Sequence, residues 1–204
     1  MSFNTKGHTV EETSFVSNYL SPGIHEAKIQ KMEFFEASSG TPGIKITHEG
    51  RPMEDLKGVG QIAETTWWLS ENAWKYTKDR LVIMADKLGV RDDFDKAGES
   101  NSPEEYTKAL DAVFKNKTAR WKFAGEEIEG KLTDEGVQKS NWFKAGLSAF
   151  GFIETLDANP SKLKFNEASK YDMKRLPAAD SEVPSSNGTS TNTGVSSNSD
   201  SPWD

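Results

Sequence analysis

Aromatic and cationic side chains alternate along short stretches of this 204-residue chain. In KTARWKFAG, residues 117–125, Trp121 and Phe123 alternate with Arg120 and Lys122. Successive side chains of a β-strand point to opposite faces, so this stretch predicts a strand with one aromatic face and one basic face. Rings that stack on bases, beside cations that contact phosphates, are typical of surfaces that bind single-stranded nucleic acid.

The same residue types recur on other predicted strands. Trp67 and Trp68 are adjacent, so they point to opposite sides of a strand and at least one is expected to leave the core. The ordinary alternative is that each tryptophan packs in the core and each lysine faces solvent. The leading candidates for DNA binding are Arg120, Trp121 and Lys122, followed by Phe123, Trp67, Trp68, Lys28, Lys31, Lys45, Trp142 and Lys144.

Turn signals arrange the first strands. Residues 23–35 and 43–48 are rich in apolar and β-branched side chains, and the intervening EASSGTP predicts a hairpin. The apolar alternation slips within residues 23–35, which indicates a β-bulge. A third strand is expected over residues 61–69.

Two helices are expected next. Ser70 caps a helix whose apolar residues follow helical spacing until Gly89. Ser102, Pro103 and Glu105 form a capping-box start for a second helix, and residues 91–101 are expected to be a loop between the two. After the strand at 117–125, residues 140–156 predict a last long strand, bent at Gly146 or Gly151.

The predicted fold is mainly β with a helical insert. Three strands, the helices and two strands have the count and order of an OB-fold-like, five-stranded Greek-key barrel with helices after strand 3. We expect an N-terminal arm over residues 1–20, a barrel domain over 21–176 and a disordered acidic tail over 177–204.

Three short motifs are better explained without a ligand. Residues 125–131 fit G-x-x-x-x-G-K, but Leu132 follows where a magnesium-binding hydroxyl is needed. Residues 93–104 resemble a calcium loop, yet Ala97 replaces an oxygen ligand and an acidic interhelical loop is the simpler interpretation. His25 and His48 lack a third zinc ligand nearby in sequence. We expect no cofactor and no metal.

Composition limits the remaining classes. The chain has no cysteine, which excludes disulfides and thiolate chemistry and fits a reducing cytoplasm. It shows no secretion signal, and its longest uncharged apolar run, residues 145–153, is too short to span a bilayer, so we expect no membrane contact and a place in the host cytoplasm.

The net charge of −7 is unevenly distributed. From residue 177 onward there are four acidic and no basic residues, which leaves 25 basic against 28 acidic residues, or −3, for the body. Residues 161–175, directly before the tail, hold five basic and two acidic side chains. A basic segment therefore adjoins an acidic tail.

The chain ends in SNSDSPWD after a long Ser/Asn/Thr/Gly run. A barrel followed by such a tail, with an acidic tip and a penultimate aromatic, resembles bacterial and phage single-stranded DNA-binding proteins. Residues 23–50 (GIHEAKIQKMEFFEASSGTPGIKITHEG) and 67–89 (WWLSENAWKYTKDRLVIMADKLG) look like the single-stranded DNA-binding family of tailed bacteriophages. The resemblance covers roughly residues 20 to 155.

This resemblance implies a non-enzymatic protein that coats exposed DNA strands in replication, recombination and repair. It also implies that the tail tip, Asp200, Pro202, Trp203 and Asp204, docks onto partner proteins. The tip departs from the family pattern because it is only lightly acidic and ends with Asp after the Trp, so partner identity is not carried over. Exchange of the N-terminal arm between subunits would give a homo-oligomer.

Two other function classes remain open at this point. A phage accessory module would use the barrel to hold a protein and would ignore DNA. A magnesium-dependent nuclease would use scattered acids such as Asp92, Asp93 and Asp95, since such carboxylates need no fixed spacing.

Deletion of residues 177–204 is expected to strengthen DNA binding. The tethered acidic tail is at high effective concentration beside the basic groove and competes with DNA, most strongly at low salt. A titration of the truncated and full-length chains with single-stranded DNA measures this effect, and unchanged or weaker affinity after truncation would count against self-screening.

Overall fold

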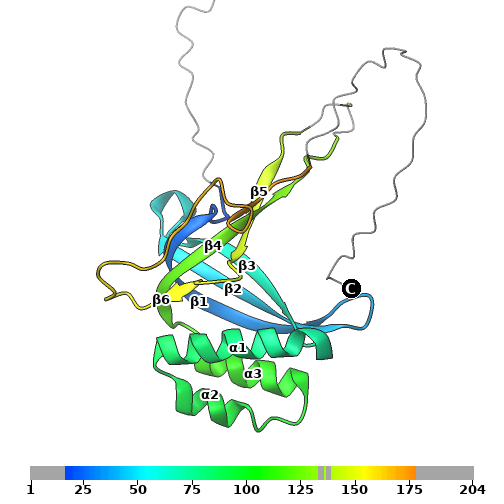
Figure 1. The fold of residues 1–204 in the computed structure, drawn as a ribbon, viewed down its shortest axis with the longest axis vertical. Coiled ribbons are helices and arrows are strands. Elements are labelled where there is room, and N and C mark those ends of the chain that lie inside the picture. The colour runs from blue at the N-terminus through cyan, green and yellow to red at the C-terminus, as the bar shows by residue number, and fades with distance from the viewer. Residues whose placement is uncertain (1–16, 133–135, 137–138, 178–204) are drawn as a thin grey trace, which may run out of the picture.

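A computed structural model describes residues 17–132, 136 and 139–177 of the chain (Figure 1). Most of the expected N-terminal arm and the tail from residue 178 lie outside the described residues. The described part is mainly β, as the sequence predicts, with a helical insert after the third strand. Its strands are β1 Gly23–Glu36, β2 Pro42–Pro52, β3 Gly60–Trp68, β4 Thr118–Ile128, β5 Trp142–Leu147, β6 Ile153–Glu154 and β7 Met173–Lys174.

The strands form one sheet with the order β3-β2-β1-β4-β5. All pairs along this path are antiparallel; β6 pairs antiparallel and β7 parallel with β4. The predicted hairpin is confirmed as β1 and β2, and the predicted bulge is confirmed by a register shift between Ile29 and Lys31. A short 3-10 helix, Glu54–Leu56, lies between β2 and β3.

The helices are α1 Glu71–Leu88, α2 Arg91–Ala97 and α3 Pro103–Phe114. The predicted α1 and α3 are confirmed, and Ser102 Oγ accepts a hydrogen bond from the Glu105 amide at 3.2 Å. The predicted loop over 91–101 is wrong for α2. Phe94 and Ala97 are buried on one side of α2, and Arg91 pairs with Asp95 one turn later, so packing and a local ion pair stabilise a helix there.

The expected last strand is divided. β5 ends at Leu147 and β6 begins at Ile153, and Gly151 between them has φ of 50°, a conformation that favours glycine. β6 then pairs with β4 beyond the residues that β5 covers, and Ile153 lies opposite Trp121. Gly151, and not Gly146, is therefore the bend.

The core lies between the inner face of the sheet and the helices, which Figure 1 shows together at one end of the sheet. A hydrogen bond of 2.7 Å from the Met32 amide to Asp111 Oδ1 joins β1 to α3. At the two ends of the strand order, β3 and β5 approach each other, and the Leu147 amide donates to Thr65 Oγ1 at 2.7 Å. The largest fully buried side chains include Trp121, Phe114, Phe123, Ile29, Ile44, Ile46, Leu81, Met84 and Leu110.

His48 lies inside this core. Its ring contacts Trp121 and Phe123 edge-on, with centroids 4.6 and 5.4 Å away, and neither ring nitrogen has a hydrogen-bond partner among the described residues. Burial disfavours the charged imidazolium and lowers the pKa of His48 from its ordinary value of 6.5 to about 3. The residue is therefore a neutral core side chain.

This burial predicts a stability change between pH 7 and pH 5. The unfolded chain takes up a proton at His48 as the pH falls through 6.5, while the folded chain does not until about pH 3. The free energy of unfolding therefore falls by about 0.7 kcal/mol from pH 7 to pH 6 and by about 1.2 kcal/mol from pH 6 to pH 5. His48→Leu is expected to flatten this slope. Urea unfolding at pH 7, 6 and 5 measures it, and equal slopes in both proteins would contradict the assignment.

Candidate nucleic-acid interface

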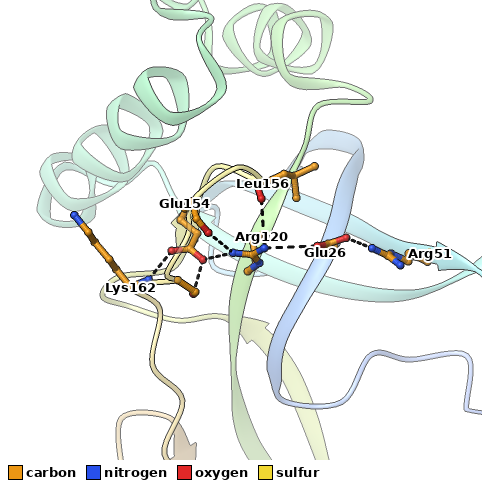
Figure 2. Close-up of polar contacts among 8 residues, drawn as sticks. Glu26, Arg51, Arg120, Glu154, Leu156 and Lys162 are labelled. Atoms are coloured by element: carbon orange, nitrogen blue, oxygen red, sulfur yellow. Dashed lines mark hydrogen bonds and ion pairs between the residues drawn. The ribbon is translucent and has the colours of Figure 1, made fainter.

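Arg120 on β4 is held inside a polar network (Figure 2). Its Nη1 donates to Glu154 Oε1 at 2.7 Å and to the Ala158 carbonyl at 3.3 Å, and its Nη2 donates to the Leu156 carbonyl at 3.4 Å. Glu26 on β1 lies 3.8 Å from the same guanidinium and also pairs with Arg51. The charge of Arg120 is thus compensated by neighbouring strands and by the segment after β6.

Glu154 is the centre of this network. It is buried on β6 and accepts hydrogen bonds from Arg120, from Ser161 Oγ and from the Lys162 amide at 2.9 Å. Burial alone would raise the pKa of Glu154, but hydrogen bonds from Ser161, Arg120 and Lys162 outweigh it and lower the pKa to about 2. Glu154 therefore stays ionised and fixes the chain that follows it.

Lys122, two residues along β4, is compensated in the same way. Its Nζ donates to Asp172 Oδ1 at 2.9 Å, and both side chains are almost fully buried. Asp172 also accepts from the Asn166 amide at 3.0 Å. We call residues 155–177, which follow β6 and contact Arg120 and Lys122 through Leu156, Ala158 and Asp172, the clasp. Arg120 and Lys122 hold the clasp, and this structural role explains both residues.

The rings of β4 are equally occupied. Trp121 and Phe123 are fully buried, and Trp121 Nε1 donates to the Ala27 carbonyl at 2.8 Å. Trp67 is also buried, beneath Arg80 and against Phe152. None of these three rings has an exposed face on which a base could stack, so the predicted DNA-binding role of Trp121, Phe123 and Trp67 is wrong.

Trp68 points the other way, as the adjacent pair predicts. Its side chain is 39% exposed on the outer face of β3, and its ring lies 5.4 Å from that of Phe35, with 59° between the planes. Gly43 lies between the two rings, because Phe35, Gly43 and Trp68 are in register across β1, β2 and β3. A Cβ at Gly43 would lie only 2.6 Å from the Phe35 ring. We call Phe35 and Trp68, with Gly43 beneath them, the aromatic platform.

Phe35 was not among the sequence candidates. Phe35 is identified from the cross-strand register, because Gly43 on the neighbouring strand β2 leaves room for its ring. Sequence reasoning gave the hairpin but no register.

The lysines of this outer face are partly compensated. Lys45 lies in the row next to the platform, between Glu33 and Thr66, and has no ion pair among the described residues. Lys31 pairs with Glu33 at 2.8 Å, which raises the pKa of Lys31. Lys28 pairs with Glu49 at 3.0 Å. The face is therefore mixed in charge and not the basic groove that the sequence suggests.

Trp142 and Lys144 lie elsewhere, on β5. Trp142 is 49% exposed and Lys144 is exposed, and both line a cavity with Ile62 and Glu64 of β3. The structure thus brings Lys31, Lys45 and Trp68 together on the outer face of the sheet. Trp142 and Lys144 lie apart from them, on β5, where they face β3 across a gap. The tail residues Asp200, Pro202, Trp203 and Asp204 lie outside the described residues.

The acidic residues considered for metal chemistry are on α2. Asp93 pairs with Lys96 and Asp95 with Arg91. In the part of the chain that the structure describes, no three His, Cys, Asp or Glu side chains come close enough to hold a metal ion. Over the same residues, no helix is both long and apolar enough to cross a bilayer.

Comparison of the chain with models of known protein families and with curated proteins finds no match. The outer face of the sheet and the residue pattern of the sequence are therefore the features that bear on function.

Substitution of Arg120 is expected to destabilise the fold and leave DNA affinity unchanged. Arg120→Ala leaves the buried Glu154 carboxylate without its cation, at a cost of about 3 kcal/mol. Glu154→Gln is the matched control, because it breaks the same pair while keeping Arg120. Chemical denaturation measures the stability and a titration with oligo-dT measures the affinity. If the Arg120→Ala protein is folded but has lost affinity for oligo-dT, Arg120 contacts the DNA and the structural assignment is wrong.

Proposed function

We propose that this chain is a non-enzymatic, single-stranded DNA-binding protein that coats exposed strands during phage replication, recombination and repair. The observation that carries the proposal is the aromatic platform, two partly exposed rings on the outer face of the sheet, with Lys45 in the adjacent row. Base stacking on such rings contributes about 1–3 kcal/mol per base and tolerates any sequence.

The strand order supports an OB-fold. β1 pairs with β2 and β4, β3 follows β2, β5 follows β4, and β3 approaches β5, which is the order of an OB barrel whose last gap is open. OB-folds bind oligonucleotides on the face of their second and third strands. Here that face carries Lys45 on β2 and Trp68 on β3.

The mixed charge of the face determines how binding should respond to salt. The lysines that could contact phosphates are Lys45, Lys31 and Lys28, and two of them already pair with glutamates. About three phosphate contacts on a single strand correspond to a slope near −2 in a plot of log affinity against log salt concentration. Stacking, and not charge, then supplies most of the affinity.

The tail fits this proposal as a recruiting and screening element. Asp200 and Asp204 flank Trp203, a combination that suits a small apolar pocket rimmed by Lys or Arg on a replication or recombination protein. Because the face has few free cations, even a lightly acidic tail competes for them.

A protein-interaction module is the second candidate, and one observation favours it. A groove of about 650 Å³ runs between α1 and the segment that joins α2 to α3. Trp74 and Tyr106 line it, with ring centroids 5.8 Å apart, beside Phe94. Aromatic-lined grooves of this kind bind proline-rich peptides in several domain families.

A binding titration separates the two candidates. Trp68→Ala is expected to weaken oligo-dT binding by about 1–3 kcal/mol, because one stacking ring is lost. Trp74→Ala is the matched control, since Trp74 is similarly exposed, at 36%, but lies on α1. Polarisation of a labelled oligo-dT at two salt concentrations measures both variants, and equal losses, or none for Trp68→Ala, would contradict the proposed face.

A further inference from the structure

A cavity lies in the gap between β3 and β5, apart from the aromatic platform. We call it the seam. It has a volume of about 330 Å³. The hydrogen bond from the Leu147 amide to Thr65 Oγ1, at 2.7 Å, joins β5 to β3, and the segment that precedes β1 bridges to Ile62 of β3. The lining residues are Tyr19, Leu20, Ile62, Ala63, Glu64, Ile128, Trp142, Phe143, Lys144 and Ala145.

The walls of the seam are strand edges. The Ile62 amide donates to the Asn18 carbonyl at 2.9 Å, and the Leu20 amide donates to the Ile62 carbonyl at 2.8 Å, so Ile62 faces the seam. Backbone groups alternate along a strand, and Glu64 therefore faces the same way. On β5 the Leu147 amide faces the seam, and so by the same alternation does Ala145.

The backbone of Ile62 is occupied by the bridge to residues 18–20, and the Leu147 amide by Thr65, so the seam-facing groups without a strand partner in the described part of the chain are those of Glu64 and Ala145. In the described residues no strand pairing joins β3 to β5. An unpaired edge presents a row of N–H and C=O groups to whatever lies beside it. The seam thus combines polar backbone edges with the apolar side chains of Ile62, Ile128 and Ala145.

Two exposed rings line the seam from different elements. Tyr19, before β1, is 58% exposed, and Trp142, at the start of β5, is 49% exposed. Lys144 lies two residues from Trp142, is exposed, and has no ion pair among the described residues. Rings, a free cation and polar edges are the groups that recognise a base together with its phosphate.

We propose that the seam binds one nucleobase of the bound strand, with Tyr19 and Trp142 contacting its faces and the backbone of Glu64 and Ala145 contacting its polar edge. This inference rests on the proposed single-stranded DNA binding and names a second contact region for the same ligand. Lys144 contacts the phosphate beside that base. The cavity volume is at the lower end of ligand pockets, which suits one flat ring system.

An added β-strand does not fit the seam. Insertion of a strand would hold β3 and β5 about 9–10 Å apart along their whole length. The contact between Leu147 and Thr65 forbids that separation at one end. The seam therefore accepts a compact group and not an extended peptide.

Photo-cross-linking tests the proposal with the full-length chain. Oligo-dT carrying 5-iododeoxyuridine in place of thymidine is irradiated in the complex, and modified peptides are mapped by mass spectrometry. We expect adducts at Trp142 or Tyr19 in addition to adducts on the aromatic platform, Phe35 and Trp68.

Affinity measurements provide the second readout. Tyr19→Ala and Trp142→Ala are each expected to weaken oligo-dT binding about 5- to 100-fold. The double variant is expected to lose less than the product of the two effects, because both rings contact the same base. Tyr76→Ala is the matched control, because Tyr76 is a similarly exposed tyrosine on α1, and this variant is expected to bind like the unmodified chain.

The outcomes distinguish the two proposals. If oligo-dT binds and adducts form only at Phe35 or Trp68, while both seam variants bind normally, the seam inference is overturned and the proposed function stands. If the unmodified chain does not bind oligo-dT, the proposed function fails and the seam inference fails with it.

Discussion

The organisation of this protein depends on β4, which is covered on both faces. Its inner face inserts Trp121 and Phe123 into the core, where the Trp121 indole also bonds to the Ala27 carbonyl of β1. On its outer face, Arg120 pairs with Glu154 of β6 and Lys122 pairs with Asp172 of the clasp. Burial of an ionised side chain is costly unless an opposite charge and hydrogen bonds compensate it, and Glu154 and Asp172 meet that requirement. β4 is thus a structural strand.

This use of charge determines what remains for a ligand. With two cations of β4 paired inside the fold, and Lys28 and Lys31 paired with glutamates, the outer face of β1, β2 and β3 has few unpaired cations beside its exposed rings. The aromatic platform exists because Gly43 leaves space between two neighbouring strands. A face of this kind favours stacking on bases over neutralisation of phosphates, which agrees with a body whose net charge is slightly negative.

The platform and the seam share one strand. Trp68 is the last residue of β3, while Ile62 and Glu64, which line the seam, lie near its start. Six residues of a strand span about 20 Å. A single DNA strand that follows β3 would meet the platform at one end and the seam at the other, so the two proposed contacts describe one path.

Local patterns in the sequence determined much of the secondary structure. Glycine and proline signals defined the hairpin, helical periodicity and Ser102 defined α1 and α3, and strand alternation required that Trp67 and Trp68 face opposite ways. These features depend on contacts within a few residues, so the spacing of residue types in the sequence is enough to predict them. The short α2 was missed because tertiary burial of Phe94 and Ala97 stabilises it.

Only the tertiary structure decided which strand faces are free. Alternation along β4 correctly separated rings from cations, but it could not indicate that Glu154 and Asp172, 34 and 50 residues later, would cover the cations. The pairing of Phe35 with Trp68 likewise needs the register of three strands. A sequence pattern predicts that a strand has two different faces. The segments that cover each face come from distant parts of the chain, and their packing determines whether an aromatic or basic side chain is free to bind a ligand.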